Sequence, residues 1–385
     1  MHSFFFNTTP SVRCGAGSAS ALSEIAGARL GPRVLLVTDP GLRALGLPQP
    51  AIDALAKNAD VAVFDAVEAD PSRATLMAAV EAGRDAGATG VVGFGGGSSL
   101  DVAKVASLLL GSGEDLDAAW GVGNAKGPRL PLVLVPTTAG TGSEVTPVAI
   151  ITVEDDEKRG VSSPVILPDL AVLDPDLTLG LPAPITAATG IDAMVHAIEA
   201  YTSRSPNANP VSRMLAIEAL RLLGANIETA VHRGDDRDAR GAMLLGSCLA
   251  GMAFANAPVA AVHALAYPVG GIFHIPHGLS NALILKDVMR FNATECATEY
   301  AALAPHVFPD TDTAEGHQSV AARFIDRMGE LSASLGLPPR LRDAGIPRDA
   351  LPRMAADAMK HTRLLVNNPR EVTETDALNI YTAAW

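Results

Sequence analysis

The chain has 385 residues, of which 48% are apolar, 18% charged and 4% aromatic, and its formal net charge is −13. The apolar fraction excludes a disordered chain and allows a large buried core. The negative charge, without a local run of Lys or Arg to offset it, excludes a nucleic-acid-binding protein, and the length predicts two or three domains.

The N-terminal ten residues have no basic segment and no long apolar core, so we expect no signal peptide there. The most apolar stretch, residues 259–273, is interrupted by His263 and Pro268, and we expect no membrane span. The three cysteines are far apart in the sequence and outside any Cys-x-x-Cys motif. They indicate reduced thiols in a cytoplasmic protein.

Short apolar runs alternate with helical patterns in the first half of the chain. The runs that predict strands are 34–38, 61–64, 90–94 and 132–135, and the patterns that predict helices are 73–86 and 100–110. Continuous apolar strands separated by helices are typical of a parallel sheet that is covered on both faces. We therefore predict an α/β dinucleotide-binding domain over residues 1–180.

From about residue 182 onward, apolar positions recur with helical spacing and no strand pattern is clear. The predicted helices are 187–202, 210–221, 239–255, 319–335 and 351–360. We predict an all-helical metal-binding and substrate domain over residues 181–385. A cleft between two such domains is a usual place for a ligand site.

A glycine-rich loop, Gly95-Gly-Gly-Ser-Ser99, follows a predicted strand and opens a helix. Gly96 and Gly97 let the backbone approach a ligand closely, Ser98 offers a hydroxyl, and a helix N-terminus attracts a pyrophosphate. The loop lacks the third glycine of the dinucleotide fingerprint. A tight turn with a serine cap explains the same residues equally well.

Two further features lie at predicted strand ends. Asp39 follows the first predicted strand, where it can accept hydrogen bonds from a ribose and repel a 2′-phosphate, although an Asx turn explains it without a ligand. Thr137, Thr138 and Thr141 belong to a second glycine loop, which otherwise is an ordinary loop with a helix cap. Two such loops in one sheet favour a nucleotide site.

Histidines and one aspartate form a candidate metal site in the helical half. Asp192 and His196 are spaced i, i+4, which places them on one helix face, and His263, His274 and His277 lie in one later stretch. Such a set suits a divalent first-row metal. A hydrogen-bonded helix pair is the alternative, but the apolar neighbours of Asp192 predict burial, which requires a partner.

The sequence resembles the iron-containing (group III) alcohol dehydrogenases over essentially its whole length. The segments that carry the resemblance are 95–104, 136–146, 190–201, 263–268 and 275–278. The resemblance implies a dehydroquinate synthase-like fold with a parallel-sheet N-terminal domain and a helical C-terminal domain. It implies an NAD-dependent oxidoreductase that acts on an alcohol or aldehyde and uses Fe²⁺, with Zn²⁺ or another divalent metal suiting the same ligands.

The resemblance also implies a role for individual residues. The metal ligands are Asp192, His196, His263 and His277, and His274 is not among them. The cofactor-binding residues are Asp39, Gly96, Gly97, Ser98, Thr137, Thr138, Thr141 and, by a weaker match, Lys158. From their positions we expect a substrate pocket that includes Thr146, Phe254, Phe273 and Thr362.

Two positions depart from the family pattern. Many members have a second histidine four residues after the third ligand, implicated in proton relay, whereas this chain has Tyr267. A tyrosine titrates near 10 and is a poor proton shuttle at neutral pH, but it can donate a hydrogen bond. A tyrosine at this position also resembles the pattern of the branch that includes hydroxyacid–oxoacid transhydrogenases and 4-hydroxybutyrate-type dehydrogenases. Pro258 stands where a glycine is usual before the third ligand, which affects the shape of the pocket.

The sequence therefore predicts metal-assisted hydride transfer between a primary or short-chain alcohol and nicotinamide. A dehydroquinate-synthase-like lyase requires a basic cluster for a phosphorylated substrate, and only Arg363 and Arg370 are candidates. A non-catalytic nucleotide-binding module is the third interpretation. We expect a homodimer or higher homo-oligomer. The Phe4-Phe-Phe6 run is either an exposed edge strand that pairs with another subunit or the first strand of the sheet.

Overall fold

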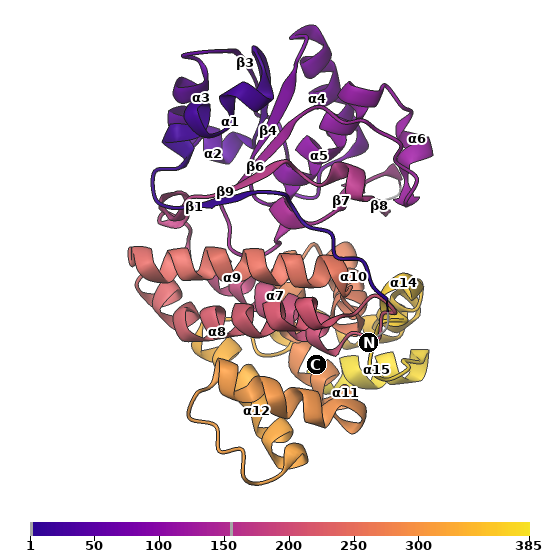
Figure 1. The fold of residues 1–385 in the computed structure, drawn as a ribbon. Coiled ribbons are helices and arrows are strands. Elements are labelled where there is room, and N and C mark those ends of the chain that lie inside the picture. Colours follow the sequence, from indigo (N-terminus) through magenta and orange to yellow (C-terminus); the bar gives the residue numbers. More distant parts are fainter. Residues whose placement is uncertain (1–2, 155–156) are drawn as a thin grey trace. The chain divides into compact units, whose positions relative to one another are not determined.

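The computed structural model in Figure 1 describes residues 3–154 and 157–385. The chain divides into two compact units. One unit is Asn7–Leu179, and the other is Gly180–Trp385 together with the described part of the N-terminal segment that ends at Phe6. The N-terminal segment thus belongs with the helical unit, because the backbone of Phe5 exchanges two hydrogen bonds of 2.9 Å with the Asn207 side chain.

The unit Asn7–Leu179 is built on a six-stranded parallel sheet in the order β1-β9-β6-β4-β2-β3. Its strands are β1 (Val12–Cys14), β2 (Arg33–Val37), β3 (Asp60–Phe64), β4 (Gly90–Gly95), β6 (Leu132–Pro136) and β9 (Leu170–Leu173). The first strand is therefore Val12–Cys14, and the expectation that the Phe4–Phe6 run is the first strand of the sheet is wrong. Pairing of this run with another subunit stays a prediction. That run forms no strand, since its backbone is held by Asn207 instead.

Helices cover both faces of this sheet (Figure 1). They are α1 (Leu22–Leu30), α2 (Pro40–Ala44), α3 (Gln49–Leu55), α4 (Arg73–Asp85), α5 (Gly97–Ser112) and α6 (Leu116–Ala119). Leu35 and Val37 of β2 pack with α4 and α5, whereas Val34 and Leu36 pack with α1 and α3. This alternation, in strands that are apolar on both faces, confirms the predicted parallel sheet.

A small second sheet in the same unit has the order β5-β8-β7. Its strands are β5 (Gly121–Val122), β7 (Val148–Thr152) and β8 (Lys158–Ser162), and β7 pairs with β8 in antiparallel orientation. The sequence analysis missed this sheet. Strand β8 has no apolar run, and β5 has two residues, so neither carries a pattern from which a strand can be predicted.

The second unit is helical, as predicted. Its helices are α7 (Ala183–Thr202), α8 (Pro210–His232), α9 (Arg237–Asn256), α10 (Ala261–Phe273), α11 (His277–Val307), α12 (His317–Ser334), α13 (Leu351–Ala358), α14 (Thr362–Leu365) and α15 (Glu374–Ala384). Helices α10 and α11 were not predicted, because each contains a proline and α11 is broken at Cys296.

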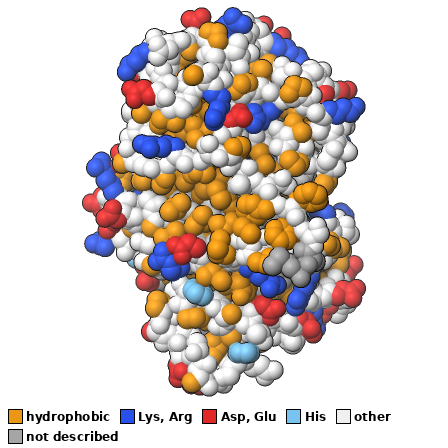
Figure 2. Space-filling view, in the orientation of Figure 1, with side chains coloured by type: hydrophobic (Ala, Val, Ile, Leu, Met, Phe, Trp, Pro, Cys, Tyr) orange, Lys and Arg blue, Asp and Glu red, His pale blue; other side chains and the backbone are white. Residues whose placement is uncertain are grey.

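Helix α7 lies at the centre of the helical unit. It packs against α8, α9 and α11, and it is buried on nearly every side. Outside it, apolar side chains gather on the surface over α8 and α9 (Figure 2). Met214, on α8, is 61% exposed. Among the described residues, no single helix has the length and hydropathy of a membrane span. Helices α9 and α10 meet both criteria only when they are taken together, and this pair is bent by 108°.

Candidate metal centre and dinucleotide site

Helix α7 positions two of the predicted metal ligands in the interior of the helical unit. Asp192 and His196 are 2% and 4% exposed, and they face the same side because they are four residues apart. A carboxylate and an imidazole cannot remain in such surroundings without partners. Their burial on a helix that is apolar on its other faces therefore indicates a site rather than a solvated helix surface.

The other two predicted ligands come from α10 and α11. His263 is in the first turn of α10 and is 3% exposed. His277 is the first residue of α11, and 39% of its side chain is exposed, so it forms the open side of the group. His274 adopts a left-handed conformation with φ of 55° at the end of α10 and lies outside the group.

The structure brings the four side chains together. One ligand atom from each of Asp192, His196, His263 and His277 lies within 4.8 Å of all the others. Asp192 Oδ1 is 3.9 Å from His196 Nε2 and 3.8 Å from the Nε2 atoms of both His263 and His277. A tetrahedral site with metal–ligand distances near 2.1 Å has ligand atoms about 3.4 Å apart. A small contraction would therefore fit the group around a divalent cation.

Asn281, one turn after His277 on α11, contacts three of these ligands. Its Nδ2 donates to Asp192 Oδ1 at 2.6 Å and lies 3.2 Å from His263 Nε2 and 3.3 Å from His277 Nε2. Its Oδ1 is buried without a hydrogen-bond partner in the described part of the chain. Acceptor atoms that converge on one donor are the arrangement that a cation requires.

Glu199, on α7, orients His263. Its carboxylate lies 2.7 Å from His263 Nδ1 and accepts the backbone N–H of Val262 at 2.7 Å. A proton held on Nδ1 by the carboxylate leaves the Nε2 lone pair free for a metal. Glu199 therefore fixes the tautomer that a metal ligand needs.

The ligand group favours an ionised carboxylate. Burial raises the pKa of Asp192, but the surrounding imidazoles of His196, His277 and His263 and the hydrogen bond from Asn281 outweigh burial, and the pKa lies below its usual value. The carboxylate is thus available as a negatively charged ligand, which a divalent cation among neutral imidazoles requires.

Aromatic rings surround the group on two sides. Phe254 of α9 stacks on His196 with ring centroids 4.4 Å apart. The ring of Tyr267, on α10, stacks on His277 with centroids 6.0 Å apart, and it also meets the ring of His361 with centroids 4.7 Å apart. Thr362, which the sequence analysis expected in the substrate pocket, follows His361 and is exposed at the start of α14.

The remaining predicted substrate residues are placed differently. Phe273 is the last residue of α10 and is partly buried. Thr146 is in the α/β unit and is 2% exposed, and its hydroxyl bonds to Lys104 Nζ at 3.2 Å. Neither residue is among the four that form the ligand group.

In the α/β unit, the predicted cofactor residues lie at the carboxyl ends of neighbouring strands. Asp39 follows β2, the Gly95–Ser99 loop follows β4 and the second glycine loop follows β6, and these three strands are adjacent in the sheet. Asp39 Oδ1 caps α2 by accepting the Leu42 N–H at 2.9 Å. The turn expected as the simpler explanation is therefore present, and the second carboxylate oxygen is left for a ligand.

The two glycine loops touch each other. Thr137 N donates to Gly95 O at 3.0 Å, and a Cβ added to Gly97 would lie 2.9 Å from Thr141 Cγ2. Residue 97 must therefore be glycine for the loops to meet. The N-cap of α5 is Gly96, so the first turn of this 16-residue helix receives no capping hydrogen bond from an N-cap side chain. This arrangement fits an anionic phosphate group.

The other predicted residues of this site are placed as follows. Thr138 lies beside Gly96, since a Cβ added to that glycine would be 3.7 Å from Thr138 Cγ2. Ser98 is in the first turn of α5 and is partly buried. Lys158 is in β8, where its Nζ lies 2.6 Å from Asp70 Oδ1, so it must exchange partners to reach a cofactor.

The sequence analysis missed Glu199 and Asn281. Glu199 is three residues after His196 on the same helix, and Asn281 is four residues after His277. Those spacings place each residue on the face of a predicted ligand. A polar residue three or four positions after a predicted histidine ligand is therefore the sequence signal from which both could have been predicted.

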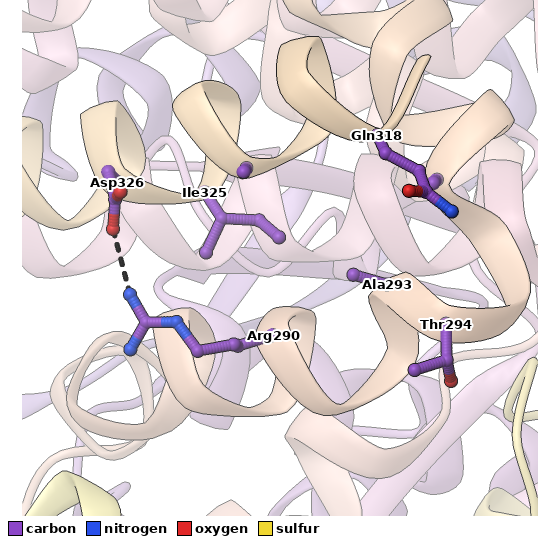
Figure 3. Close-up of a pocket in the computed structure, with 8 residues that line it drawn as sticks. Arg290, Ala293, Thr294, Gln318, Ile325 and Asp326 are labelled. Atoms are coloured by element: carbon purple, nitrogen blue, oxygen red, sulfur yellow. Dashed lines mark hydrogen bonds and ion pairs between the residues drawn. The ribbon is translucent and has the colours of Figure 1, made fainter.

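A separate pocket lies between α11 and α12 (Figure 3). Arg290 bonds to Asp326 across one end of it at 2.8 Å, and its other lining residues include Thr294, Gln318 and Ile325. None of the metal-ligand candidates lines this pocket. It has no group of ligating side chains, and we assign no chemistry to it.

Comparison with known proteins gives consistent results along the chain. A model of iron-containing alcohol dehydrogenases matches residues 9–175, and a model of the C-terminal part of Fe-containing alcohol dehydrogenases matches residues 186–385. A relative from Geobacillus thermodenitrificans, long-chain-alcohol dehydrogenase 1, is 40% identical over 362 residues, which cover 93% of this chain and 91% of that protein.

Solved structures share the whole fold. A 1,3-propanediol oxidoreductase has a TM-score of 0.96 and 34% identity, with 100% of both chains covered. A sulfoacetaldehyde reductase from Bifidobacterium kashiwanohense, solved in complex with NAD⁺, has a TM-score of 0.88 and 28% identity, with 100% of this chain and 99% of that chain covered.

Proposed function

Because the chain belongs to the iron-containing alcohol dehydrogenase family, we propose that the residues named below carry out NAD-dependent alcohol oxidation and the reverse carbonyl reduction. The observation that carries the proposal is the convergence of Asp192, His196, His263 and His277 within 4.8 Å. The substrate class that we propose is a primary or short-chain alcohol and its aldehyde or ketone.

Asp192, His196, His263 and His277 would hold the divalent metal, for which Fe²⁺ is the family's expected ion. When bound, the cation supplies Lewis acidity toward the alcohol oxygen, and the nicotinamide accepts the hydride. Glu199 keeps His263 in the tautomer that exposes Nε2. Phe254 covers one side of His196 and limits the access of water there.

In the α/β unit, the first turn of α5 and the hydroxyls of Thr137, Thr138 and Thr141 would hold the pyrophosphate of NAD. Support comes from the contact between the two glycine loops and from the uncapped start of α5. The Asp39 carboxylate would accept a ribose hydroxyl and repel a 2′-phosphate, which favours NAD over NADP. Lys158 would join them after it leaves Asp70.

Tyr267 would donate a hydrogen bond to the substrate oxygen rather than shuttle a proton. Its ring lies against His277, the most exposed member of the ligand group, which supports a place at the open side. A phenolic O–H is a hydrogen-bond donor. The Tyr267→Phe variant therefore should lose turnover and keep its metal.

The experiment that tests this proposal combines a metal analysis with an NADH absorbance assay. The purified protein is loaded with Fe²⁺ or Zn²⁺ and assayed with short primary alcohols, longer alcohols, 4-hydroxybutyrate and the corresponding aldehydes. We expect one metal equivalent per chain and activity that chelation removes and metal restores. Full activity in protein stripped of metal would refute the proposal. Activity that is confined to 4-hydroxybutyrate would instead support the hydroxyacid branch.

We also propose that the chain forms a homo-oligomer and acts in the cytoplasm. The apolar surface over α8 and α9 and the exposure of Met214 on α8 support the first proposal. The cysteines support the second, since none of the three forms a disulfide. Light scattering of the purified protein, with Met214→Glu as the comparison, tests the oligomer.

A further inference from the structure

A buried charged pair on α5 binds the segment that follows the second glycine loop. Lys104 is fully buried, and its Nζ lies 2.7 Å from Ser143 Oγ, 2.7 Å from Val148 O and 3.2 Å from Thr146 Oγ1. These are the three shortest of the four hydrogen bonds that the ammonium group donates. All three acceptors belong to residues 143–148, so a single ammonium group fixes that segment to the middle of α5.

Asp101, one turn before Lys104 on α5, completes the arrangement. Its Oδ1 accepts the Ser143 hydroxyl at 2.6 Å and lies 3.4 Å from Lys104 Nζ, and its Oδ2 accepts the Ile150 N–H at 2.9 Å. We call this arrangement the Asp101–Lys104 clamp. It joins α5 to both ends of the connection between the second glycine loop and β7.

The stability of the fold does not explain why this buried pair is charged. Burying an ammonium group is costly, and buried ion pairs that are replaced by apolar side chains of similar volume often leave stability unchanged or higher. Burial lowers the pKa of Lys104, although Asp101 acts in the opposite direction. A methionine has nearly the length of lysine and would fill the same space without that cost. A role in fixing one conformation accounts for the charge better than a role in holding the fold.

The parts that the clamp joins are the two parts of the candidate pyrophosphate site. Helix α5 begins at Gly97, and Ser143 comes two residues after Thr141. The loops meet where a Cβ on Gly97 would lie 2.9 Å from Thr141 Cγ2. The loops are thus too close together for a side chain at position 97, and a shift of residues 143–148 would change the separation between the α5 amides and the threonine hydroxyls.

We propose that the Asp101–Lys104 clamp is a positioning element for the phosphates of the dinucleotide, because it sets the second glycine loop against the first turn of α5. The inference rests on the proposed function, since it assumes that these loops bind NAD. Lys104 has no exposed surface and acts through the backbone and hydroxyls that it binds. Its effect should therefore fall on binding of the pyrophosphate and leave the metal centre unchanged.

The test compares Lys104→Met with a matched control, Lys57→Met, which changes an exposed lysine of the same unit. Binding of NADH is measured by fluorescence, and binding of ADP-ribose and adenosine by competition. For Lys104→Met we expect about tenfold weaker binding of NADH and ADP-ribose, adenosine binding within about twofold, and a larger change in the KM for NAD than in kcat. Metal content and melting temperature should match those of the parent and of the control.

Three results would overturn the inference. One is a Lys104→Met protein that binds NADH as tightly as the control, and another is an equal loss for adenosine and ADP-ribose, which indicates general damage to the unit. If Lys104→Met does not fold, Ser143→Ala removes only the bridging hydroxyl, and unchanged ADP-ribose binding in that variant is the third. A parent protein that binds no NADH would refute the proposed function instead.

Discussion

Replacing Glu199 by glutamine should weaken metal binding although Glu199 is not itself one of the four ligands. The carboxylate makes two hydrogen bonds of 2.7 Å, one with His263 Nδ1 and one with the Val262 N–H. Glutamine has one oxygen and one NH₂ group, so it can keep the bond from Val262 only by presenting its NH₂ to Nδ1. That contact favours the imidazole tautomer whose proton is on Nε2, the atom that the metal needs.

The expected size follows from these contacts. Hydrogen bonds to a charged group contribute about 1.5–3 kcal/mol each. One orientation of the amide loses the bond from a proton on His263 Nδ1, and the other loses the bond from the Val262 N–H. We therefore expect Glu199→Gln to bind metal roughly 10- to 100-fold more weakly, which is the range for loss of a residue that orients a ligand. The fold should persist, because glutamine preserves the shape of the buried side chain.

The measurement is the dissociation constant of Co²⁺ or Zn²⁺, obtained by competition with a chromophoric chelator. Glu218→Gln is the matched control, since Glu218 forms an exposed ion pair with Arg221 on α8 and contacts no ligand. Circular dichroism shows whether each variant is folded. A folded Glu199→Gln protein whose metal affinity stays within twofold of the parent would contradict the role of the carboxylate in setting the tautomer.

Three further outcomes are expected. His263→Ala should lose tight metal binding and turnover together, and turnover that persists without bound metal, measured on the same preparation, would refute its role. Asp39→Ser keeps an oxygen to cap α2 but removes the charge, so the ratio of kcat/KM for NADP to that for NAD should rise about tenfold or more with little change in melting temperature; an unchanged ratio would exclude Asp39 as the selecting residue. Burial raises the pKa of Glu144 from 4.5 to about 7, so the folded protein retains a proton that the unfolded chain loses, and its stability falls as pH rises from about 5 to 7. Glu144→Gln has no carboxyl group to titrate, so its free energy of unfolding should rise by about 3 kcal/mol relative to that of the parent as the pH increases from 5 to 8, as measured by denaturant unfolding. Parallel pH profiles of the two proteins would show that Glu144 does not titrate in this range.

The sheet of the α/β unit was predictable because its strands are buried on both faces and therefore read as uninterrupted apolar runs, as in Val34–Val37 and Leu132–Val135. The antiparallel pair β7 and β8 was not predictable, since β8 begins with the exposed residues Lys158 and Arg159 and has no apolar run. Helix α10 was missed for another reason. Its sequence contains Pro268 and two glycines, which are usually signals for the end of a helix.

The candidate site was only partly accessible from spacing. The i, i+4 pair of Asp192 and His196 predicts one helix face, but no local pattern shows that His263 and His277 meet them, and the resemblance to a family supplied that expectation. Glu199 and Asn281 were missed because a single acid or amide on a helix has many ordinary explanations. Their contacts become visible only when α10 and α11 lie against α7.

The four ligand atoms come from three helices, α7, α10 and α11, and the chain between Asp192 and His277 includes all of α8 and α9. A cation held by them would cross-link the two ends of this long segment. Its binding free energy would add to the free energy of unfolding of the helical unit. The lifetime of this unit in a cell would then depend on the supply of metal. Protein made without enough metal would unfold more often and would be degraded sooner by proteases.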